Sequence, residues 1–199
     1  LSIRRQRQMC IRDRFSSLFL LTIFPFMYLI VGLIIKITSP GPIFFKQERN
    51  GENGKIFKCY KFRSMKVNAL SDSLQATKND PRKTKFGNFL RKSNLDELPQ
   101  FINVFKGEMS IVGPRPHMLK HTEEYSQLIN KYMMRHLVKP GITGWAQVTG
   151  YRGETKELSQ MEGRVRRDLW YIENWTFLLD IRIMIKTVTN MFRGEKNAY

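Results

Sequence analysis

The chain has 199 residues, of which 42% are hydrophobic and 26% charged, a composition typical of one folded domain with its own core. Lys and Arg number 34 against 17 Asp and Glu, and the formal net charge of +17 indicates an anionic partner: nucleic acid, anionic lipid or a phosphorylated substrate. The two cysteines, Cys10 and Cys59, exclude a disulfide framework and a cysteine metal cluster, and we expect cytoplasmic exposure.

The chain begins with a basic segment, LSIRRQRQMCIRDR, that shows no hydrophobic periodicity. We interpret residues 1–14 as a basic leader, either truncated or foreign to the rest of the chain, and assign it no catalytic role. The apolar run that follows is longer than that of a secretory signal peptide and lacks a small-residue cleavage site.

Residues 15–35 carry no charged side chain, and a helix of this length could just cross a bilayer core about 30 Å thick. Pro25 lies near the middle of the run, where it removes a backbone hydrogen bond and favours a kink into two short arms. Basic residues flank the run on both sides, and such flanks prefer the cytoplasmic face of a membrane. The pattern favours a re-entrant helical hairpin, with a simple span as the alternative.

A turn and a hairpin follow. Two prolines and a glycine in TSPGP exclude regular structure over residues 38–42. Residues 43–49 and 55–63 then predict two strands around the turn-rich loop NGENG, an arrangement that suits a β-hairpin. Lys61 and Arg63 leave this hairpin, either as solvated surface charges or as part of a site. The polar residues 67–83 predict a short helix and an exposed loop.

Two adjacent acids, Asp96 and Glu97, lie in the most informative stretch of the chain, residues 85–116. Apolar residues recur there at three- and four-residue spacing, which predicts an amphipathic helix with Ser93 or Asn94 as its N-cap. The acids would then lie in the first turn, next to Arg91, in a setting that favours ionised carboxylates and a nearby phosphate or metal ion. Acids also occur in first turns simply because they stabilise the helix.

The segment Gly113-Pro114-Arg115-Pro116 predicts a rigid elbow that holds the Arg115 guanidinium in one place, either for a structural role or for bidentate phosphate binding. His117 and His121 are four residues apart, but the glutamate of a zinc-protease motif and a third ligand are missing, so we reject a zinc site. Residues 122–136 predict a helix. Residues 140–153, PGITGWAQVTGYRG, predict a loop and a short strand.

The C-terminal residues 158–192 predict two helices. The second has one apolar face, which either packs in the core or, with three aromatic residues nearby, lies in the head-group region of a membrane. The face comprises Phe177, Leu178, Ile181, Ile185, Val188 and Phe192, and the nearby aromatic residues are Trp170, Tyr171 and Trp175.

Several motifs in fixed order resemble the bacterial sugar transferase family, the monotopic polyprenyl-phosphate phosphoglycosyl transferases. They are SPGP at 39–42, KFRSM at 61–65, LRKSNLDELPQ at 90–100, NVFKGEMSIVGPRP at 103–116 and VKPGITGWAQVTGYRG at 138–153. The later segments YRGETKEL, RVRRDLWYIENWTFLLDI and KNAY are similar to the glucose-transferring, long-form branch of the family. Members of that branch carry an N-terminal multi-span region and a soluble domain, so we expect this chain to be a catalytic fragment.

The resemblance implies a mixed, helix-rich α/β fold, with residues 15–37 as a re-entrant membrane helix. Residues 38–199 would form a small membrane-associated catalytic domain with a β-hairpin and amphipathic helices. The implied reaction moves a sugar-1-phosphate, glucose-1-phosphate in this branch, from a UDP-sugar to undecaprenyl phosphate and releases UMP. This would be the first membrane step of exopolysaccharide, capsule or O-antigen synthesis.

The resemblance also assigns roles to residues. Asp96 resembles the family nucleophile, and Glu97 lies beside it for metal binding or proton transfer. Both are expected ligands of Mg²⁺, which prefers a few oxygen ligands together with substrate phosphates. Arg91 and Arg115 would bind phosphate, Lys61 and Arg63 would belong to the substrate site, and Pro25 would form the membrane kink.

The expected partners are a UDP-sugar, undecaprenyl phosphate and membrane lipids, with no nucleic acid, and homo-oligomerisation stays open. We expect the chain at the bacterial inner membrane with its catalytic domain facing the cytoplasm. Two other classes compete with an enzyme: a basic membrane-anchored nucleic-acid binder and a non-catalytic scaffold of a polysaccharide assembly complex. The sequence shows no known nucleic-acid-binding module, and it retains Asp96 and Arg91, which a scaffold would be free to lose.

Overall fold

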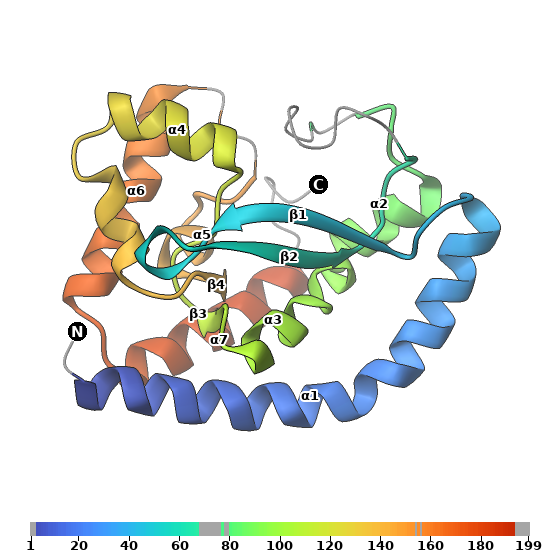
Figure 1. Ribbon diagram of the computed structural model, residues 1–199, viewed down its shortest axis with the longest axis horizontal. Helices are drawn as coiled ribbons and strands as arrows, with labels where there is room; N and C mark the ends of the chain where they lie inside the picture. The colour runs from blue at the N-terminus through green and yellow to red at the C-terminus, as the bar shows by residue number, and fades with distance from the viewer. Residues whose placement is uncertain (1–2, 68–76, 78–79, 154, 156, 194–199) are drawn as a thin grey trace.

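Helices surround two small sheets in a mixed, helix-rich α/β arrangement (Figure 1), which confirms the predicted fold class at this level. The computed structural model describes residues 3–67, 77, 80–153, 155 and 157–193. In chain order its elements are α1 (Ile3–Thr38), β1 (Phe44–Asn50), the 3-10 turn η1 (Glu52–Gly54), β2 (Ile56–Phe62), α2 (Lys85–Lys92), the 3-10 turn η2 (Leu95–Glu97), α3 (Gln100–Lys106), β3 (Ser110–Val112), α4 (Leu119–Leu128), the 3-10 segment η3 (Tyr132–Leu137), β4 (Gly141–Thr143), α5 (Trp145–Val148), α6 (Leu158–Glu173) and α7 (Phe177–Arg193).

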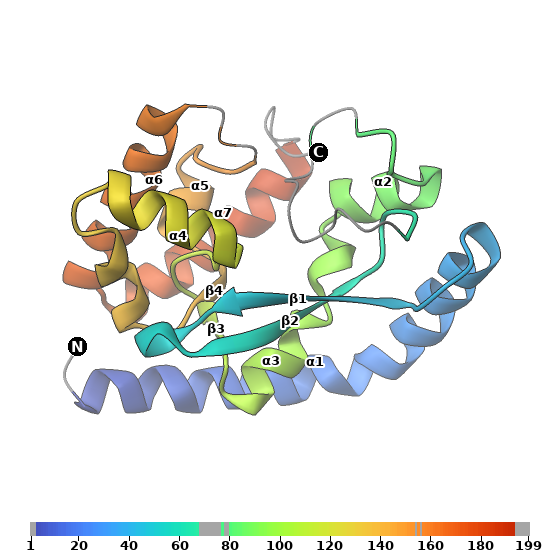
Figure 2. The same ribbon diagram turned by 45° about the horizontal axis from the view of Figure 1, so that its top comes forward.

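The longest element is α1, which contains Pro25 and also includes residues 3–14 of the expected leader. Pro25 does not end the helix, because a helix can accommodate a proline by losing one hydrogen bond and bending. In Figures 1 and 2, α1 follows one edge of the molecule and then bends towards the hairpin. Within the described part of the chain, no helix combines the length and the apolar character needed to cross a membrane. The re-entrant hairpin stays a prediction.

The C-terminal half of α1 carries apolar side chains on two sides. Val31 and Ile35 are buried against Phe62 of β2 and Leu90 of α2. Each fully buried side chain of this kind stabilises the fold by roughly 1.5–3 kcal/mol. The other side is exposed and comprises Phe26, Leu29, Ile30, Leu33 and Ile37.

Strands β1 and β2 form the predicted antiparallel hairpin, with Phe44 opposite Phe62 and Asn50 opposite Ile56. Asn53 in the connecting turn has a φ of 54°, and Gly54 has a φ of 75°. Asparagine and glycine adopt such positive φ values more readily than other residues, which explains why NGENG closes the hairpin.

The acid-bearing segment forms a 3-10 turn followed by a separate helix, and not the single amphipathic helix that we predicted. The cause is Pro99, because its ring would clash with the carbonyl of Leu95 in a continuous α-helix. Asn94 does lie at the position preceding the turn, but its side chain does not cap it. Asp96 and Glu97 therefore lie in η2, between α2 and α3.

Two other predicted segments have different outcomes. The short helix and loop predicted over residues 67–83 fall largely outside the described residues. The helix predicted over residues 122–136 is wrong as one element, since α4 ends at Leu128 and η3 begins at Tyr132. Lys131 between them has a φ of 62°, a left-handed conformation that an α-helix cannot continue through.

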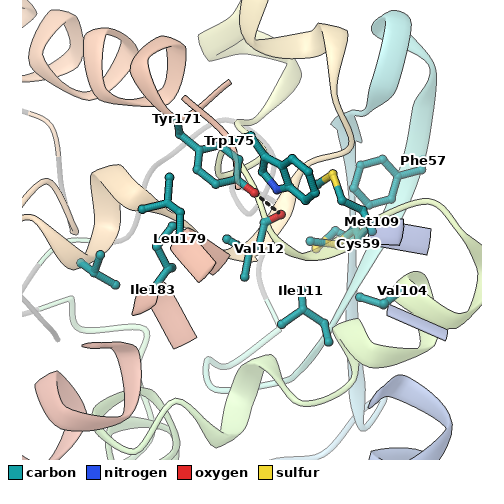
Figure 3. Close-up of a cluster of buried hydrophobic side chains, with 12 residues drawn as sticks. Phe57, Cys59, Val104, Met109, Ile111, Val112, Tyr171, Trp175, Leu179 and Ile183 are labelled. Carbon is teal, nitrogen blue, oxygen red and sulfur yellow. Dashed lines mark hydrogen bonds between the residues drawn. The ribbon is translucent and has the colours of Figure 1, made fainter. Parts of the chain in front are cut away.

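The two C-terminal helices were predicted correctly, and they pack with the short parallel pair of β3 and β4. Figure 3 shows Tyr171 of α6 directing its hydroxyl group to the carbonyl oxygen of Val112 in β3. The residues labelled in Figure 3 form the main core: Phe57, Cys59, Val104, Met109, Ile111, Val112, Tyr171, Trp175, Leu179 and Ile183.

The apolar face that we described on the last helix is not the face that packs. Leu179 and Ile183 of α7 are buried, whereas Phe177, Leu178, Ile185 and Val188 are exposed. Core packing is therefore excluded for these four exposed residues. Periodic spacing identifies the apolar sides of a helix but does not say which side the rest of the chain covers.

Candidate active site

A cavity of about 460 Å³ lies where β1, β2 and the turn η2 meet the elbow around Arg115. Ten of its lining residues are Lys or Arg, whereas Asp96 and Glu97 supply all the acidic side chains among the described lining residues. Such an excess of positive charge in a concave site favours an anionic ligand. Arg152 and Arg164 are among the ten, and the uncharged lining residues include Ser64, Asn94 and His117.

Local backbone geometry directs the acid pair to this cavity. Asn94 has a φ of 58°, so the chain turns sharply between α2 and the acids. The guanidinium of Arg152 donates a hydrogen bond to Oδ1 of Asn94 and ties the turn to the segment that follows α5. Lys61 reaches the acids from β2, because strand alternation puts it on the same face as the buried Phe57 and Cys59.

Glu97 is held by two cations. Lys61 Nζ lies 2.6 Å from Glu97 Oε1, Arg115 Nη2 lies 2.5 Å from the same oxygen, and Arg115 Nη1 lies 3.3 Å from Oε2. Burial acts to raise the pKa of Glu97, but the charges and hydrogen bonds of Arg115 and Lys61 outweigh it and hold that pKa well below its usual range. Glu97 is therefore a fixed carboxylate that orients both cations.

Asp96 has a contrasting environment. Its side chain is buried, with 6% of the residue exposed, and within the described chain it receives no hydrogen bond. Burial, the largest cause, and the charge of Glu97 outweigh the opposite effect of Lys61, Arg91 and Arg115, and together they raise the pKa of Asp96 to about 6. Two neighbouring carboxyl groups with well-separated pKa values are typical of sites that give them different tasks.

The other predicted site residues have diverse contacts. Arg91 lines the cavity and donates from Nε to Ser64 Oγ at 2.8 Å. Arg63 also borders the cavity, but its two terminal nitrogens each lie 2.6 Å from a carbonyl oxygen, those of Ser39 and Pro40 after α1.

The structure thus brings four of the predicted site residues together: Lys61, Asp96, Glu97 and Arg115. Arg91 lies close by, whereas the hydrogen bonds of Arg63 hold it at the end of α1. Pro25 belongs to α1 and not to the described cavity lining.

The elbow that carries Arg115 is supported by a buried ion pair. Arg135 Nη2 donates to the Arg115 carbonyl oxygen at 2.8 Å and lies 2.6 Å from Asp168 Oδ2. Both side chains of this pair are almost completely buried. Removing one partner of such a pair typically costs about 3–5 kcal/mol, because the other charge stays buried alone.

Sequence reasoning missed Ser64, Arg152, Arg164 and Arg135 as parts of the site or of its support. Ser64 and Arg152 lie inside motifs that were recognised, KFRSM and GYRG, so a residue-by-residue reading of those motifs could have singled them out. Arg164 also begins a recognised segment, RVRRDLWYIENWTFLLDI, but that segment was used only for the choice of sugar, and Arg135 lies in none of the quoted segments. Their burial depends on how α6 and η3 pack, which spacing along the chain does not report.

The chain belongs to the bacterial sugar transferase family, because the family model described as bacterial sugar transferase matches residues 5–194. It is 57% identical over 187 residues to a UDP-glucose:undecaprenyl-phosphate glucose-1-phosphate transferase of Escherichia coli (strain K12), covering 92% of this chain and 39% of that protein. A protein of the same name from Xanthomonas campestris pv. campestris is 54% identical, with 90% of this chain and 37% of that protein covered.

A third relative is close to this chain in length. The exopolysaccharide production protein PSS of Rhizobium leguminosarum bv. phaseoli is 46% identical over 190 residues, which cover 92% of this chain and 94% of that protein. By contrast, the chain spans less than two fifths of the length of the Escherichia coli and Xanthomonas relatives, at 39% and 37%.

Proposed function

We propose that this chain transfers glucose-1-phosphate from UDP-glucose to undecaprenyl phosphate and releases UMP. The observation that carries the proposal is the contrast at η2: Asp96 receives no hydrogen bond in the described chain, while its neighbour Glu97 is held by Lys61 and Arg115. This contrast leaves one carboxylate available for a reaction inside a strongly basic cavity. The printed names of the Escherichia coli and Xanthomonas relatives support glucose as the sugar.

The proposed reaction has two displacements. An oxygen of the Asp96 carboxylate attacks the β-phosphorus of UDP-glucose, and the bond from that phosphorus to the oxygen bridging the two phosphates breaks. UMP leaves with the electron pair, and glucose-1-phosphate stays on Asp96 as an acyl phosphate. An oxygen of undecaprenyl phosphate then attacks the same phosphorus, which breaks the bond to Asp96 and restores the carboxylate.

The basic residues would offset the charge that builds up on the phosphates. Lys61 and Arg115 are already oriented by Glu97, and Arg91 is oriented by Ser64. Preorganised cations of this kind stabilise a phosphoryl-transfer transition state without having to move during the reaction. Splitting the reaction in two also lets one cavity bind a water-soluble donor and a lipid acceptor in turn.

Magnesium is part of the proposal. The two carboxylates fit Mg²⁺ only if the substrate phosphates complete its ligand set, because no group of three or more His, Cys, Asp or Glu gathers in the described chain. Asp96 and Glu97 would hold the ion, and it would supply positive charge to the diphosphate.

We also propose that residues 15–37 enter and leave one membrane leaflet while residues 38–199 face the cytoplasm at the bacterial inner membrane. The exposed apolar side of α1 and the exposed residues Phe177, Leu178, Ile185 and Val188 of α7 support this placement. Trp170 is also exposed, and tryptophan favours the head-group region. The net charge of +17 would strengthen contact with anionic lipids.

The assay that tests the activity is UMP release from a panel of UDP-sugars, with and without undecaprenyl phosphate. We expect steady turnover only when the acceptor is present, with UDP-glucose preferred. A preference for UDP-galactose or a UDP-N-acetylhexosamine would contradict the choice of sugar. Absence of UMP release with every donor would leave the scaffold as the better interpretation.

A further inference from the structure

His117 and Arg164 line the cavity beside the elbow that carries Arg115, and neither has a role in the reaction described so far. Both are nearly covered, with 4% of His117 and 6% of Arg164 exposed. Each nevertheless has a buried nitrogen without a hydrogen-bond partner among the described residues, Nε2 of His117 and Nε of Arg164. A buried donor left unpaired destabilises the fold, so a ligand that supplies acceptor oxygens accounts for both.

The contacts of His117 fix where its proton lies. Its Nδ1 is 2.7 Å from Arg135 Nη1 and 2.7 Å from the Tyr132 hydroxyl oxygen. A guanidinium has only donors, so Nδ1 must accept, and the proton of the neutral ring lies on Nε2. Burial, together with the charges of Arg135 and Arg164, holds the pKa of His117 well below its usual range, which keeps the ring neutral. His117 therefore presents one N–H donor at the cavity.

Arg164 presents a charge as well as a donor. Its Nη2 donates to the Gly153 carbonyl oxygen at 3.0 Å, and no ion pair with a described acid neutralises it. Burial and the charges of Arg135 and Arg115 outweigh the opposite effect of Asp168 and lower the pKa of Arg164 to about 10, so the side chain stays positive at neutral pH. A buried cation with cationic neighbours is costly unless an anion accompanies it.

We propose that His117 and Arg164 form a phosphate subsite that holds, in turn, the phosphate of the departing nucleotide and the phosphate of the incoming lipid. The inference rests on the proposed function and specifies its second binding position. Phosphoryl displacement places the attacking and leaving oxygens roughly in line. UMP therefore leaves from the side of the phosphorus opposite Asp96, and the lipid phosphate must later attack from that same side.

The position of the subsite agrees with this geometry. His117 follows Arg115 by two residues, a separation of at most about 7 Å between Cα atoms. Arg115 influences both groups, since its charge lowers the pKa of Asp96 and that of Arg164. The elbow thus links the acid pair to the subsite.

The test separates binding from chemistry in the full 199-residue chain. UMP binding is measured by titration calorimetry in an Asp96→Asn background, with Arg164→Met and His117→Asn as variants. Asparagine can keep an acceptor near the Nδ1 position for Arg135 but lacks the donor at Nε2. Arg166→Met is the matched control, because Arg166 is an exposed residue of the same helix. Uridine, which has no phosphate, serves as the reference ligand.

We expect Arg164→Met to weaken UMP binding at least tenfold and His117→Asn severalfold, with uridine binding unchanged and Arg166→Met like the parent. With Asp96 present, both variants should slow covalent labelling by UDP-glucose and also slow transfer of the label to undecaprenyl phosphate. Thermal unfolding checks that each variant is folded. If one is not, Arg164→Gln replaces Arg164→Met and His117→Leu replaces His117→Asn.

Unchanged UMP affinity in folded variants would show that His117 and Arg164 do not form a phosphate subsite. If the variants slow only the covalent labelling and not the transfer to undecaprenyl phosphate, the nucleotide and the lipid do not share this subsite. Failure of the proposed function looks different, because the unmodified chain itself would then release no UMP and take up no label.

Discussion

Asp96 and Glu97 are neighbours in the sequence but differ in what surrounds them. Glu97 receives three hydrogen bonds from Lys61 and Arg115, whereas Asp96 is buried beside them and receives none from the described residues. Burial is the main cause that raises the pKa of Asp96, which is about 6 and close to the pH at which the chain would work. The difference suits Asp96 to the proposed reactive role and Glu97 to an orienting one.

The raised pKa predicts how the first half-reaction depends on pH. Only the ionised carboxylate of Asp96 can attack, so the rate of covalent labelling should fall about tenfold per pH unit below about 6. Lys61→Met removes a charge that lowers this pKa, and the acidic limb should therefore move to higher pH. Lys58→Met, an exposed position on the same strand, is the control. An acidic limb that stays in place in Lys61→Met would show that Asp96 does not set it.

At the scale of elements, α2 is important because it holds Arg91 against the end of β2. A Cβ atom at Gly87 would lie 1.9 Å from the Ser64 carbonyl oxygen, so α2 packs directly on the backbone there. Ser64 also accepts the hydrogen bond from Arg91 Nε. The contact explains why a glycine lies inside this helix despite its low helix propensity.

Gly87→Ala should therefore destabilise the chain by about 1–3 kcal/mol, although Gly→Ala in a helix is normally stabilising by up to about 1 kcal/mol. The variant should also raise the KM for UDP-glucose, because Ser64 and Arg91 would be displaced together. Asn88→Ala, an exposed change in the same helix, is the control. The two measurements are thermal unfolding and steady-state kinetics. A Gly87→Ala melting temperature equal to or above that of the parent would be inconsistent with the contact.

Local patterns predicted the elements whose boundaries have strong chemical signals. The hairpin follows from NGENG between two strand-like runs, and α6 and α7 follow from helical periodicity. The prediction of a single helix after Asn94 was wrong because it followed the periodic apolar pattern and did not allow for Pro99, which interrupts the helix. The acid pair and Arg115 were found through motifs. By contrast, Arg164 and His117 come together because α6 packs against η3, whose Tyr132 and Arg135 contact His117, and these segments are distant along the chain.

At the scale of the whole molecule, apolar residues are exposed on both α1 and α7. The sets are Phe26, Leu29, Ile30, Leu33 and Ile37 on α1 and Phe177, Leu178, Ile185 and Val188 on α7. Exposed apolar surface of this extent normally has a partner, and the basic composition favours an anionic lipid surface. The proposed membrane contact would let a lipid-linked acceptor reach the cavity without leaving the bilayer.

The proposed re-entrant arrangement predicts that both flanks of residues 15–35 face the cytoplasm. Single cysteines at Arg14 and Lys46, both exposed, are introduced after Cys10 and Cys59 are changed to serine. A membrane-impermeant maleimide should label both positions in inverted membrane vesicles and neither in intact spheroplasts. Labelling of one position from each side would replace the hairpin with a true membrane span.

The measurement that tests the central claim most directly is covalent labelling of Asp96. The chain is incubated with UDP-glucose carrying ³²P in the β-phosphate and with no acceptor, and the modified peptide is then identified. We predict about one label per chain, located on Asp96, released by hydroxylamine as expected for an acyl phosphate, and passed on when undecaprenyl phosphate is added. Asp96→Asn should melt like the parent and take up no label. If an active preparation never becomes labelled, and its initial rates indicate a ternary complex of donor and acceptor, then Asp96 is not the nucleophile and the two-step reaction is wrong.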